Sequence, residues 1–227
     1  MQAVILAAGR GTRLFPLTNN TPKPLIRVGN KNIIEHNISQ LPDEINELIF
    51  VVGYLNKQII NYFGQRYKGN KITYVKQNKL LGSGQALSLC KNILRERFLV
   101  LMGDNIYSKP DIEKCLKHEQ CMLVQEIQEG FTGGRIIFNG NGELKGIVEG
   151  RHKKGKNLIN TALYVMTKKF FNYDLVPIKQ GKEYGLPQTL AKVAKDYPVM
   201  IEKADFWLQI NSIAELEKAR TTLNNKK

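Results

Sequence analysis

The sequence predicts a three-layer α/β fold: a mixed, mostly parallel sheet with helices on both faces. Three observations predict it. Of the 227 residues, 42% are hydrophobic, which is enough for a buried core and excludes intrinsic disorder. The longest apolar runs fall far below the roughly 18 residues that a membrane-spanning helix needs. Short β-rich runs alternate with segments of helical period along most of the chain, which is typical of a sheet covered by helices.

In the first half, strands and helices alternate. We expect strands at 3–6, 48–52, 72–75 and 98–102, and helices whose apolar faces cover 33–41, 55–67 and 81–94. The second and fourth of these strands are continuously apolar, as strands buried on both faces of a parallel sheet are. The resulting βαβαβαβ order is that of a doubly wound, Rossmann-like sheet.

The second half changes to closely spaced strands. Apolar runs at 122–126, 135–138, 144–148 and 159–166 are separated by turn residues such as Gly133-Gly134, so we expect an antiparallel subregion there. Helices are expected after Leu186 and from Ser212, where Ser212 and Glu215 fit a capping box. No linker of low complexity separates the halves, so residues 1–227 are expected to form a single domain.

The net charge of +14 leaves two interpretations open. Clustered cations would favour a nucleic-acid or membrane-surface partner, whereas a lysine-rich surface would produce the same total. The lysines are scattered rather than gathered in one block, which favours the second interpretation. We therefore predict no nucleic-acid and no membrane partner. A basic nucleic-acid-binding protein stays as a minor alternative that rests on charge alone.

The N-terminus and the cysteines favour a cytoplasmic protein. Met1-Gln2 runs directly into an apolar segment, without the basic region of a secretory signal. Cys90, Cys115 and Cys121 form no Cys-x-x-Cys pair, and their odd number suits a reducing compartment. We expect them to be buried or half-buried thiols.

A glycine-rich loop follows the first predicted strand. Its residues are Leu6, Ala7, Ala8, Gly9, Gly11 and Thr12. Small residues let main-chain N–H groups approach a base or a phosphate, while Arg13 and the proline-flanked Lys23 add positive charge. The segment matches neither a P-loop nor the dinucleotide fingerprint, whose third glycine is Leu14 here. The loop therefore predicts a binding site for a triphosphate in a protein that is neither a P-loop protein nor a dinucleotide-binding protein.

Asp104 directly follows the predicted strand at 98–102. Open α/β sheets bind ligands at the carboxyl ends of their strands. A carboxylate there can anchor Mg²⁺, with water and phosphate oxygens completing the octahedron. Alone, a Gly-Asp pair is a weak signal; together with the glycine-rich loop it predicts a magnesium-phosphate site.

The order of these motifs resembles the nucleotidyltransferase family that makes nucleotide sugars. The specific part runs from Leu6 to Leu25, and Gly103-Asp104 follows in the matching order. Further matching positions are Gln77, Leu81-Gly82-Ser83-Gly84-Gln85-Ala86, Gly133-Gly134-Arg135, Ile147-Val148-Glu149, Ile159-Asn160-Thr161 and Glu183-Tyr184. The order is especially similar to the N-acetylglucosamine-1-phosphate uridylyltransferase domain and to glucose-1-phosphate thymidylyl- and uridylyltransferases.

The resemblance implies transfer of a nucleotidyl group from UTP or dTTP to a sugar 1-phosphate, with Mg²⁺ as cofactor and pyrophosphate as product. It implies a transferase domain alone, with about 1–110 binding the nucleotide and about 111–227 binding the sugar phosphate, and no left-handed β-helix acetyltransferase domain. A homo-oligomer is also allowed for, because relatives often self-associate.

The resemblance also implies roles for single residues. The nucleotide-binding set is Leu6, Ala7, Ala8, Gly9, Gly11, Thr12, Gln77, Gly82, Ser83 and Asp104. The catalytic set is Arg13, Lys23 and Asp104. The sugar-phosphate set is Gly134, Glu149, Asn160 and Arg151. Gln77 and Gly82 would read the edge of uracil or thymine. Arg151, or else Lys153, would replace a lysine that many relatives carry at the position of Gly150.

The second metal ligand departs from the family pattern. Many relatives carry an aspartate in a Trp-x-Asp segment, where this chain has Gln209 after Trp207. Asn211 matches an asparagine of the N-acetylglucosamine enzymes. The sequence leaves open whether Gln209 or Asn211 joins Asp104, and either amide oxygen is a weaker magnesium ligand than a carboxylate.

A CTP:phosphocholine-type cytidylyltransferase is the alternative enzyme. Its C-terminal segment also resembles 208–212 of this chain. An ammonium acceptor calls for an anionic or aromatic pocket, and no aromatic cluster stands out in the sequence. The choice among UTP, dTTP and CTP stays open, and so does the sugar.

Overall fold

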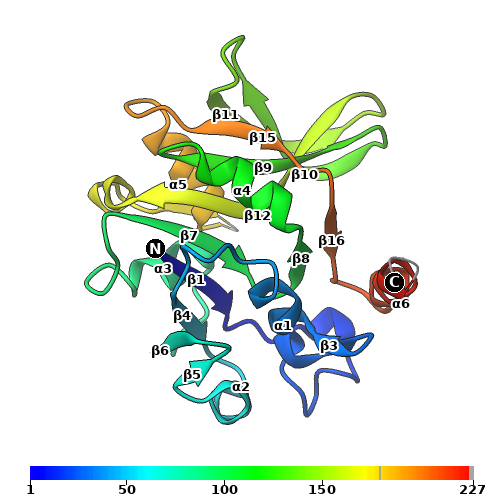
Figure 1. Ribbon diagram of the computed structural model, residues 1–227. Helices are drawn as coiled ribbons and strands as arrows, with labels where there is room; N and C mark the ends of the chain where they lie inside the picture. The colour runs from blue at the N-terminus through cyan, green and yellow to red at the C-terminus, as the bar shows by residue number, and fades with distance from the viewer. Residues whose placement is uncertain (179, 225–227) are drawn as a thin grey trace.

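A ten-stranded mixed sheet forms the centre of the molecule, and helices pack on both of its faces (Figure 1). The computed structural model describes residues 1–178 and 180–224 of the chain. Along its main path the strand order is β11-β10-β12-β7-β1-β4-β6-β5, while β9 pairs with both β12 and β15. This sheet confirms the predicted fold class.

The first half supplies the parallel part of the sheet. Its strands are β1 (Gln2–Ala7), β4 (Glu47–Val52), β6 (Asn70–Lys76) and β7 (Arg97–Met102), with β5 (Arg66–Tyr67) antiparallel at the edge. β1 pairs in parallel with β4 on one side and β7 on the other. All six residues of β1 are buried, so its carboxyl end leads straight from the centre of the sheet into the glycine-rich loop.

Alternate residues of β1 face two different cores. Val4 and Leu6 pack with residues of α3 and α5, whereas Ala3 and Ile5 pack with residues of α1, α2 and α4. The helices are α1 (Ile33–Ile38), α2 (Asn56–Phe63), α3 (Ser83–Ser88), α4 (Lys109–Leu116) and α5 (Leu186–Val193). Strand side chains alternate between the faces, so a continuously apolar strand is stable only where both faces are covered.

The second half supplies the predicted antiparallel subregion. Its strands are β9 (Cys121–Ile127), β10 (Phe131–Phe138), β11 (Leu144–His152) and β12 (Asn157–Thr167). β10 pairs with β11, and β12 pairs with β9 and β7, all antiparallel. β15 (Met200–Lys203) pairs in parallel with β9. β12 therefore joins the two halves into one sheet.

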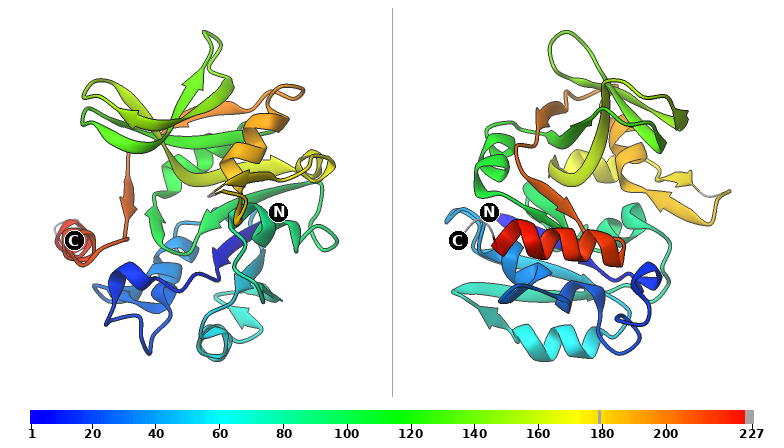
Figure 2. Two further views of the ribbon diagram at one scale, coloured as in Figure 1. Left: turned by 180° about the vertical axis from the view of Figure 1, so that it is seen from behind. Right: turned by 90° about the vertical axis from the view of Figure 1, so that its right-hand side faces the viewer.

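The end of the chain returns to the first half. β16 (Trp207–Gln209) pairs antiparallel with β8 (Asn105–Tyr107). α6 (Ile213–Asn224) then buries Leu216 and Ala219 in a cluster with residues of the first half, and it lies beside the first-half elements in both views of Figure 2. This return brings residues 209–211 next to the end of β7.

Short elements complete the chain. They are the 3-10 turns η1 (Thr12–Leu14), η2 (Lys23–Leu25) and η3 (Lys168–Asn172), and the strands β2 (Arg27–Val28), β3 (Lys31–Asn32), β13 (Val176–Ile178) and β14 (Glu183–Gly185). Cys90, Cys115 and Cys121 are free and buried, as predicted. Within the described residues, no helix has both the length and the apolar character needed to cross a membrane.

The helices of the first half are shorter than their apolar spacing predicts. The helix expected at 55–67 ends at Phe63, because Gly64 takes a φ of 61° and Tyr67 already lies in β5. The helix expected at 81–94 ends at Ser88, and turns continue the apolar contacts beyond it. The spacing of apolar residues shows which side chains face the core. It does not distinguish a continuous helix from a series of turns that buries the same side chains.

Candidate active site

A cleft opens where β1 and β7 end. Its two parts have volumes of about 370 and 380 Å³ and share lining residues, so they are continuous. The shared residues are Leu6, Gly9, Gly11, Thr12, Met102 and Glu183. The first part adds Ala8, Gln77, Gly82 and Ser83, and the second adds Ala7, Arg13, Lys23, Asp104 and Asn211. The structure thus brings together all the residues expected to bind nucleotide or act in catalysis.

The glycine-rich loop turns sharply at Gly11. This residue directly precedes η1 and takes a φ of 65°, a left-handed conformation that glycine adopts without strain. A Cβ at Gly11 would lie 3.0 Å from the Cβ of Lys23, so the loop packs directly on the lysine. The hydroxyl of Thr18 donates to the carbonyl of Gly11 at 2.8 Å. The loop is therefore held against the residue that carries the charge of the cleft.

The first part of the cleft is closed by a second glycine turn. Gly82 takes a φ of 91°, and a Cβ there would lie 2.5 Å from the carbonyl oxygen of Tyr184 in β14. The Tyr184 N–H donates to the Leu81 carbonyl at 2.8 Å, and the Leu186 N–H donates to the Ser83 hydroxyl at 3.2 Å. Only glycine permits this approach, which docks the turn onto the second half of the chain.

The second part contains a buried lysine. The side chain of Lys23 is only 8% exposed, and its Nζ donates to Asp104 Oδ2 at 2.7 Å and to Asn211 Oδ1 at 2.8 Å. A buried ammonium is stable only when it is paired and hydrogen-bonded, and these two oxygens provide that. Arg13 lines the same part from an exposed position. The second part of the cleft thus offers two cations among its described lining residues to a polyphosphate.

The donor set around Lys23 fits a magnesium ion. Asp104 Oδ2 and Asn211 Oδ1 both lie within 2.8 Å of one ammonium, so they already converge on a single positive charge. Hard oxygen ligands of this kind are the ones that Mg²⁺ takes beside phosphates. Among the described residues, no group of three or more His, Cys, Asp or Glu side chains could hold a metal. Gln209 is exposed and lies outside the residues that line the cleft.

Three hydrogen bonds place Asn211. The N–H of the preceding Ile210 donates to the Asp104 carbonyl at 3.1 Å, which ties the segment to the end of β7. The N–H of Asn211 donates to Glu215 Oε2 at 2.6 Å, and the N–H of Glu215 donates to the Ser212 hydroxyl at 3.2 Å. Ser212 acts as predicted, but Glu215 closes on Asn211 and not on Ser212. The first hydrogen bond of the expected capping box is therefore present, whereas the second is made to the N–H of Asn211, one residue before Ser212.

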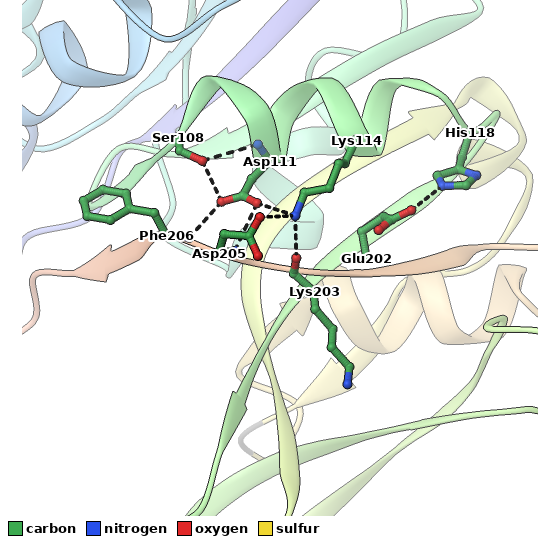
Figure 3. Close-up of polar contacts among 8 residues, drawn as sticks. All are labelled: Ser108, Asp111, Lys114, His118, Glu202, Lys203, Asp205 and Phe206. Carbon is green, nitrogen blue, oxygen red and sulfur yellow. Dashed lines mark hydrogen bonds and ion pairs between the residues drawn. The ribbon is translucent and has the colours of Figure 1, made fainter.

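A buried carboxylate anchors the segment that leads to β16 (Figure 3). Asp111 of α4 is fully buried and accepts the N–H groups of Asp205 and Phe206, each at 3.0 Å. Lys114 Nζ contacts Asp111 Oδ1 at 2.8 Å, and the Ser108 hydroxyl donates to Oδ2 at 2.6 Å. Burial alone would raise the pKa of Asp111, but these hydrogen bonds outweigh it and lower the pKa. The ionised carboxylate of Asp111 therefore holds the segment at 205–206 that leads to β16.

The residues expected to bind the sugar phosphate lie around β10, β11 and β12. Gly134 pairs with Glu149, and Glu149 Oε1 accepts from Gln188 Nε2 at 2.8 Å. Asn160 donates to the hydroxyl of Tyr164 at 2.5 Å. Burial raises the pKa of that phenol, which stays neutral. Gly134, Glu149 and Asn160 thus lie on three neighbouring strands, and the side chains of Glu149 and Asn160 are each held by a hydrogen bond.

Arg151 and Lys153 are placed elsewhere. Both line a separate cavity of about 840 Å³ at the far end of the β10–β11 pair. Its other lining residues are Gly130, Phe131, Thr132, His152 and Lys154. Within the described part of the chain, neither cation is among the residues that line the cleft, and neither are Gly134, Glu149 and Asn160.

Comparison with known proteins shows where this cleft belongs. Residues 2–226, almost the whole chain, match the sequence profile of the family described as nucleotidyl transferase. The chain belongs to the nucleotidyl transferase family.

Several members of the nucleotidyl transferase family align over most of the chain. The bifunctional protein GlmU of Methanococcus maripaludis is 32% identical over 100% of this chain and 55% of its own length. The UTP–glucose-1-phosphate uridylyltransferase AglF of Haloferax volcanii is 35% identical over 84% of this chain and 82% of its own. A solved UDP-glucose pyrophosphorylase in complex with UDP-glucose covers 100% of this chain and 99% of that one, at 20% identity and a TM-score of 0.82, which shows a shared fold. The chain spans about half the length of the GlmU proteins that it matches.

In this nucleotidyl transferase, some residues of the cleft and some that contact predicted site residues had no role assigned from the sequence. Glu183 lines both parts of the cleft, and Gln85 accepts a hydrogen bond from Gln77. Both belong to segments that match the family, so the motif was the available signal. Gln188, the partner of Glu149, stands outside every motif, and only its place in the first turn of α5 reveals it.

Proposed function

We propose that this chain transfers a nucleotidyl group from a nucleoside triphosphate, with UTP or dTTP favoured, to a sugar 1-phosphate. The observation that carries the proposal is the convergence of Lys23, Asp104 and Asn211 in a cleft continuous with the glycine-rich loop and Gln77. The first part of the cleft would take the base and ribose, and the second part would take the phosphates. The activity named for AglF, a UTP–glucose-1-phosphate uridylyltransferase, supports this choice.

The chemistry follows from the charges in the cleft. An oxygen of the sugar 1-phosphate attacks the α-phosphorus in line, the bond from that phosphorus to the bridging oxygen breaks, and pyrophosphate leaves with the electron pair. The attacking phosphate is already an anion, so no general base is needed. The rate must come from positioning two anions that repel each other and from neutralising the charge of the transition state.

Each cleft residue has a task in this scheme. Lys23 and Arg13 neutralise the triphosphate and the departing pyrophosphate. Asp104 and Asn211 would hold Mg²⁺, which supplies further charge neutralisation at the phosphates when it is bound. Small residues of the loop let its backbone approach the nucleotide.

The acceptor side of the proposal comprises Gly134, Glu149 and Asn160. Glu149 would accept hydrogen bonds from sugar hydroxyls, and Gln188 holds its carboxylate in place. Arg151 lines a cavity whose described lining includes none of Gly134, Glu149 and Asn160, so we do not group it with them at the sugar phosphate. We also propose that the protein acts in the cytoplasm, since its three cysteines are free and buried.

A pyrophosphate-release grid tests the proposed function. UTP, dTTP, CTP, ATP and GTP are each incubated with sugar 1-phosphates or phosphocholine, with and without Mg²⁺. We expect pyrophosphate only when UTP or dTTP, a sugar 1-phosphate and Mg²⁺ are present together, and we expect Asp104→Ala to abolish it. Preference for CTP with phosphocholine would favour the alternative cytidylyltransferase, and duplex or single-strand binding below micromolar without turnover would favour the nucleic-acid interpretation.

A further inference from the structure

The amide of Gln77 can lie in only one orientation. Its side chain is almost fully buried, and Nε2 lies 3.2 Å from the carbonyl oxygen of Gly82 and 2.7 Å from Oε1 of Gln85. A main-chain carbonyl only accepts hydrogen bonds, so the atom that faces Gly82 must be the NH₂ group. Both hydrogens of Gln77 are then in use. Its Oε1 is left as the polar atom available to a ligand in the cleft.

Gln85 and Gly82 are themselves held in place. Gly82 precedes the first residue of α3, and its close approach to Tyr184 fixes the turn that presents its carbonyl. Gln85 lies in the first turn of α3, and Ala86, one residue later, is buried in the core. The two acceptors that face Gln77 are therefore positioned by the fold, without any contribution from a ligand.

An acceptor in this position discriminates between pyrimidine bases. Uracil and thymine carry an N3–H donor between two carbonyl groups, whereas N3 of cytosine is an acceptor. An oxygen that faces N3 completes a hydrogen bond with the first two bases and opposes a second acceptor in cytosine. A site built around such a bond strongly rejects an analogue that cannot make it, because the buried polar groups are left unpaired.

We propose that Gln85 is a positioning residue that holds the Gln77 amide with its oxygen toward the base, and that this pair selects uracil or thymine over cytosine. The inference rests on the proposed function for the nature of the ligand, a nucleoside triphosphate. It goes beyond that function because it assigns part of the choice of base to Gln85, which contacts Gln77 through a hydrogen bond.

Three variants of Gln85 test the proposal. Gln85→Glu keeps an acceptor against Nε2 of Gln77 and serves as the matched control. Gln85→Leu removes the acceptor at similar volume, and Gln85→Lys replaces it with a donor that attracts Oε1 away from the base. The readout is the ratio of the dissociation constants for CTP and UTP, measured by calorimetry with EDTA and without an acceptor substrate, after circular dichroism has shown that each variant is folded.

We expect wild type and Gln85→Glu to bind UTP at least about ten-fold more tightly than CTP, which corresponds to about 1.4 kcal/mol. The ratio should fall several-fold in Gln85→Leu and approach one in Gln85→Lys. In turnover, the change should fall on the KM for UTP more than on kcat, because Gln85 is not among the described residues that line the part of the cleft with Lys23 and Asp104. A wild-type ratio in both Gln85→Leu and Gln85→Lys would overturn this inference alone. Folded wild type that binds neither nucleotide would overturn the proposed function as well.

Discussion

The ammonium of Lys23 lies 2.7 Å from Asp104 Oδ2, although 81 residues separate the two in sequence. The same ammonium also contacts Asn211 Oδ1 at 2.8 Å. Since these two oxygens are the proposed ligands of Mg²⁺, the lysine and the metal compete for them. Binding of a nucleotide with its metal therefore requires Lys23 to exchange these oxygens for phosphate oxygens.

This competition predicts that removing the lysine strengthens metal binding in the absence of nucleotide. We expect Lys23→Met to bind Mn²⁺ about ten-fold more tightly than wild type, because the carboxylate loses its ammonium partner and must find another cation. Titration of free Mn²⁺ by electron paramagnetic resonance measures this directly. The double variant Lys23→Met, Asp104→Asn is the control and should lose the gain. Equal affinities in Lys23→Met and wild type would contradict the prediction.

The bond between Glu215 and Asn211 predicts an effect on the nucleotide site from outside it. In Glu215→Ala, the N–H of Asn211 loses its acceptor at 2.6 Å, so the amide oxygen is held less firmly. We expect the KM for the nucleoside triphosphate to rise about five-fold, with a loss of about 1 kcal/mol in stability, as for other bonds at a helix N-terminus. Glu217→Ala is the matched control, since this residue of α6 is exposed and, among the interactions described, its side chain pairs only with Arg220. Equal KM values in the two variants would refute the role of Glu215.

Local sequence patterns predicted the strands and the position of the cleft. The pairing of segments far apart in sequence determined which side chains meet there. The continuously apolar runs at 48–52 and 98–102 predicted buried strands of a parallel sheet, and they form β4 and β7 on the two sides of β1. The loop after β1 predicted the position of the cleft, because parallel strands end at a common edge. No local pattern could choose between Gln209 and Asn211. That choice depends on the antiparallel pairing of β16 with β8, which directs Asn211 toward Lys23 across 188 residues of sequence.

The acceptor side shows the same limit. Gly134 and Glu149 lie in separate motifs, and only the register of β10 with β11 makes them direct neighbours. Arg151 was expected to replace the lysine that many relatives carry at the position of Gly150, next to Glu149. The structure instead places Arg151 in a cavity with Phe131 and Thr132. The role of Arg151 at the sugar phosphate therefore stays a prediction, because Glu149 and Arg151 contact different neighbours although both lie on β11.

Glu149 and Arg151 give a paired prediction for the acceptor. In Glu149→Gln, the charged acceptor becomes neutral, and we expect the KM for the sugar 1-phosphate to rise about ten-fold, as for the loss of a hydrogen bond to a charged group. The KM for the nucleotide should stay near its wild-type value. Arg151→Ala should leave both constants within about two-fold of wild type, because its cavity is separate. Initial rates with each substrate varied in turn measure the four values, and a larger effect of Arg151→Ala than of Glu149→Gln would reverse our assignment.

Asp111 predicts how stability responds to acid. Burial raises its pKa, but hydrogen bonds from Lys114, Ser108 and the chain at 205–206 lower it below its usual value of 3.8. The folded state therefore binds this proton less readily than the unfolded state. The resulting stability is fully present above the unfolded pKa and is lost as the pH falls through the folded pKa.

Asp111→Asn isolates this contribution. We expect the variant to be about 3 kcal/mol less stable than wild type at pH 7, because Lys114 loses its buried partner. The gap should begin to narrow as the pH falls below 3.8, because the unfolded wild type then binds a proton that the folded state still resists, whereas the variant has no such proton to bind. Urea denaturation at pH 7, 5, 4 and 3 measures the gap. Glu113→Gln is the matched control on the same helix, and its side chain is 49% exposed. A gap that stays constant down to pH 3 would mean that the charge of Asp111 does not hold the segment leading to β16, and that its shape alone does.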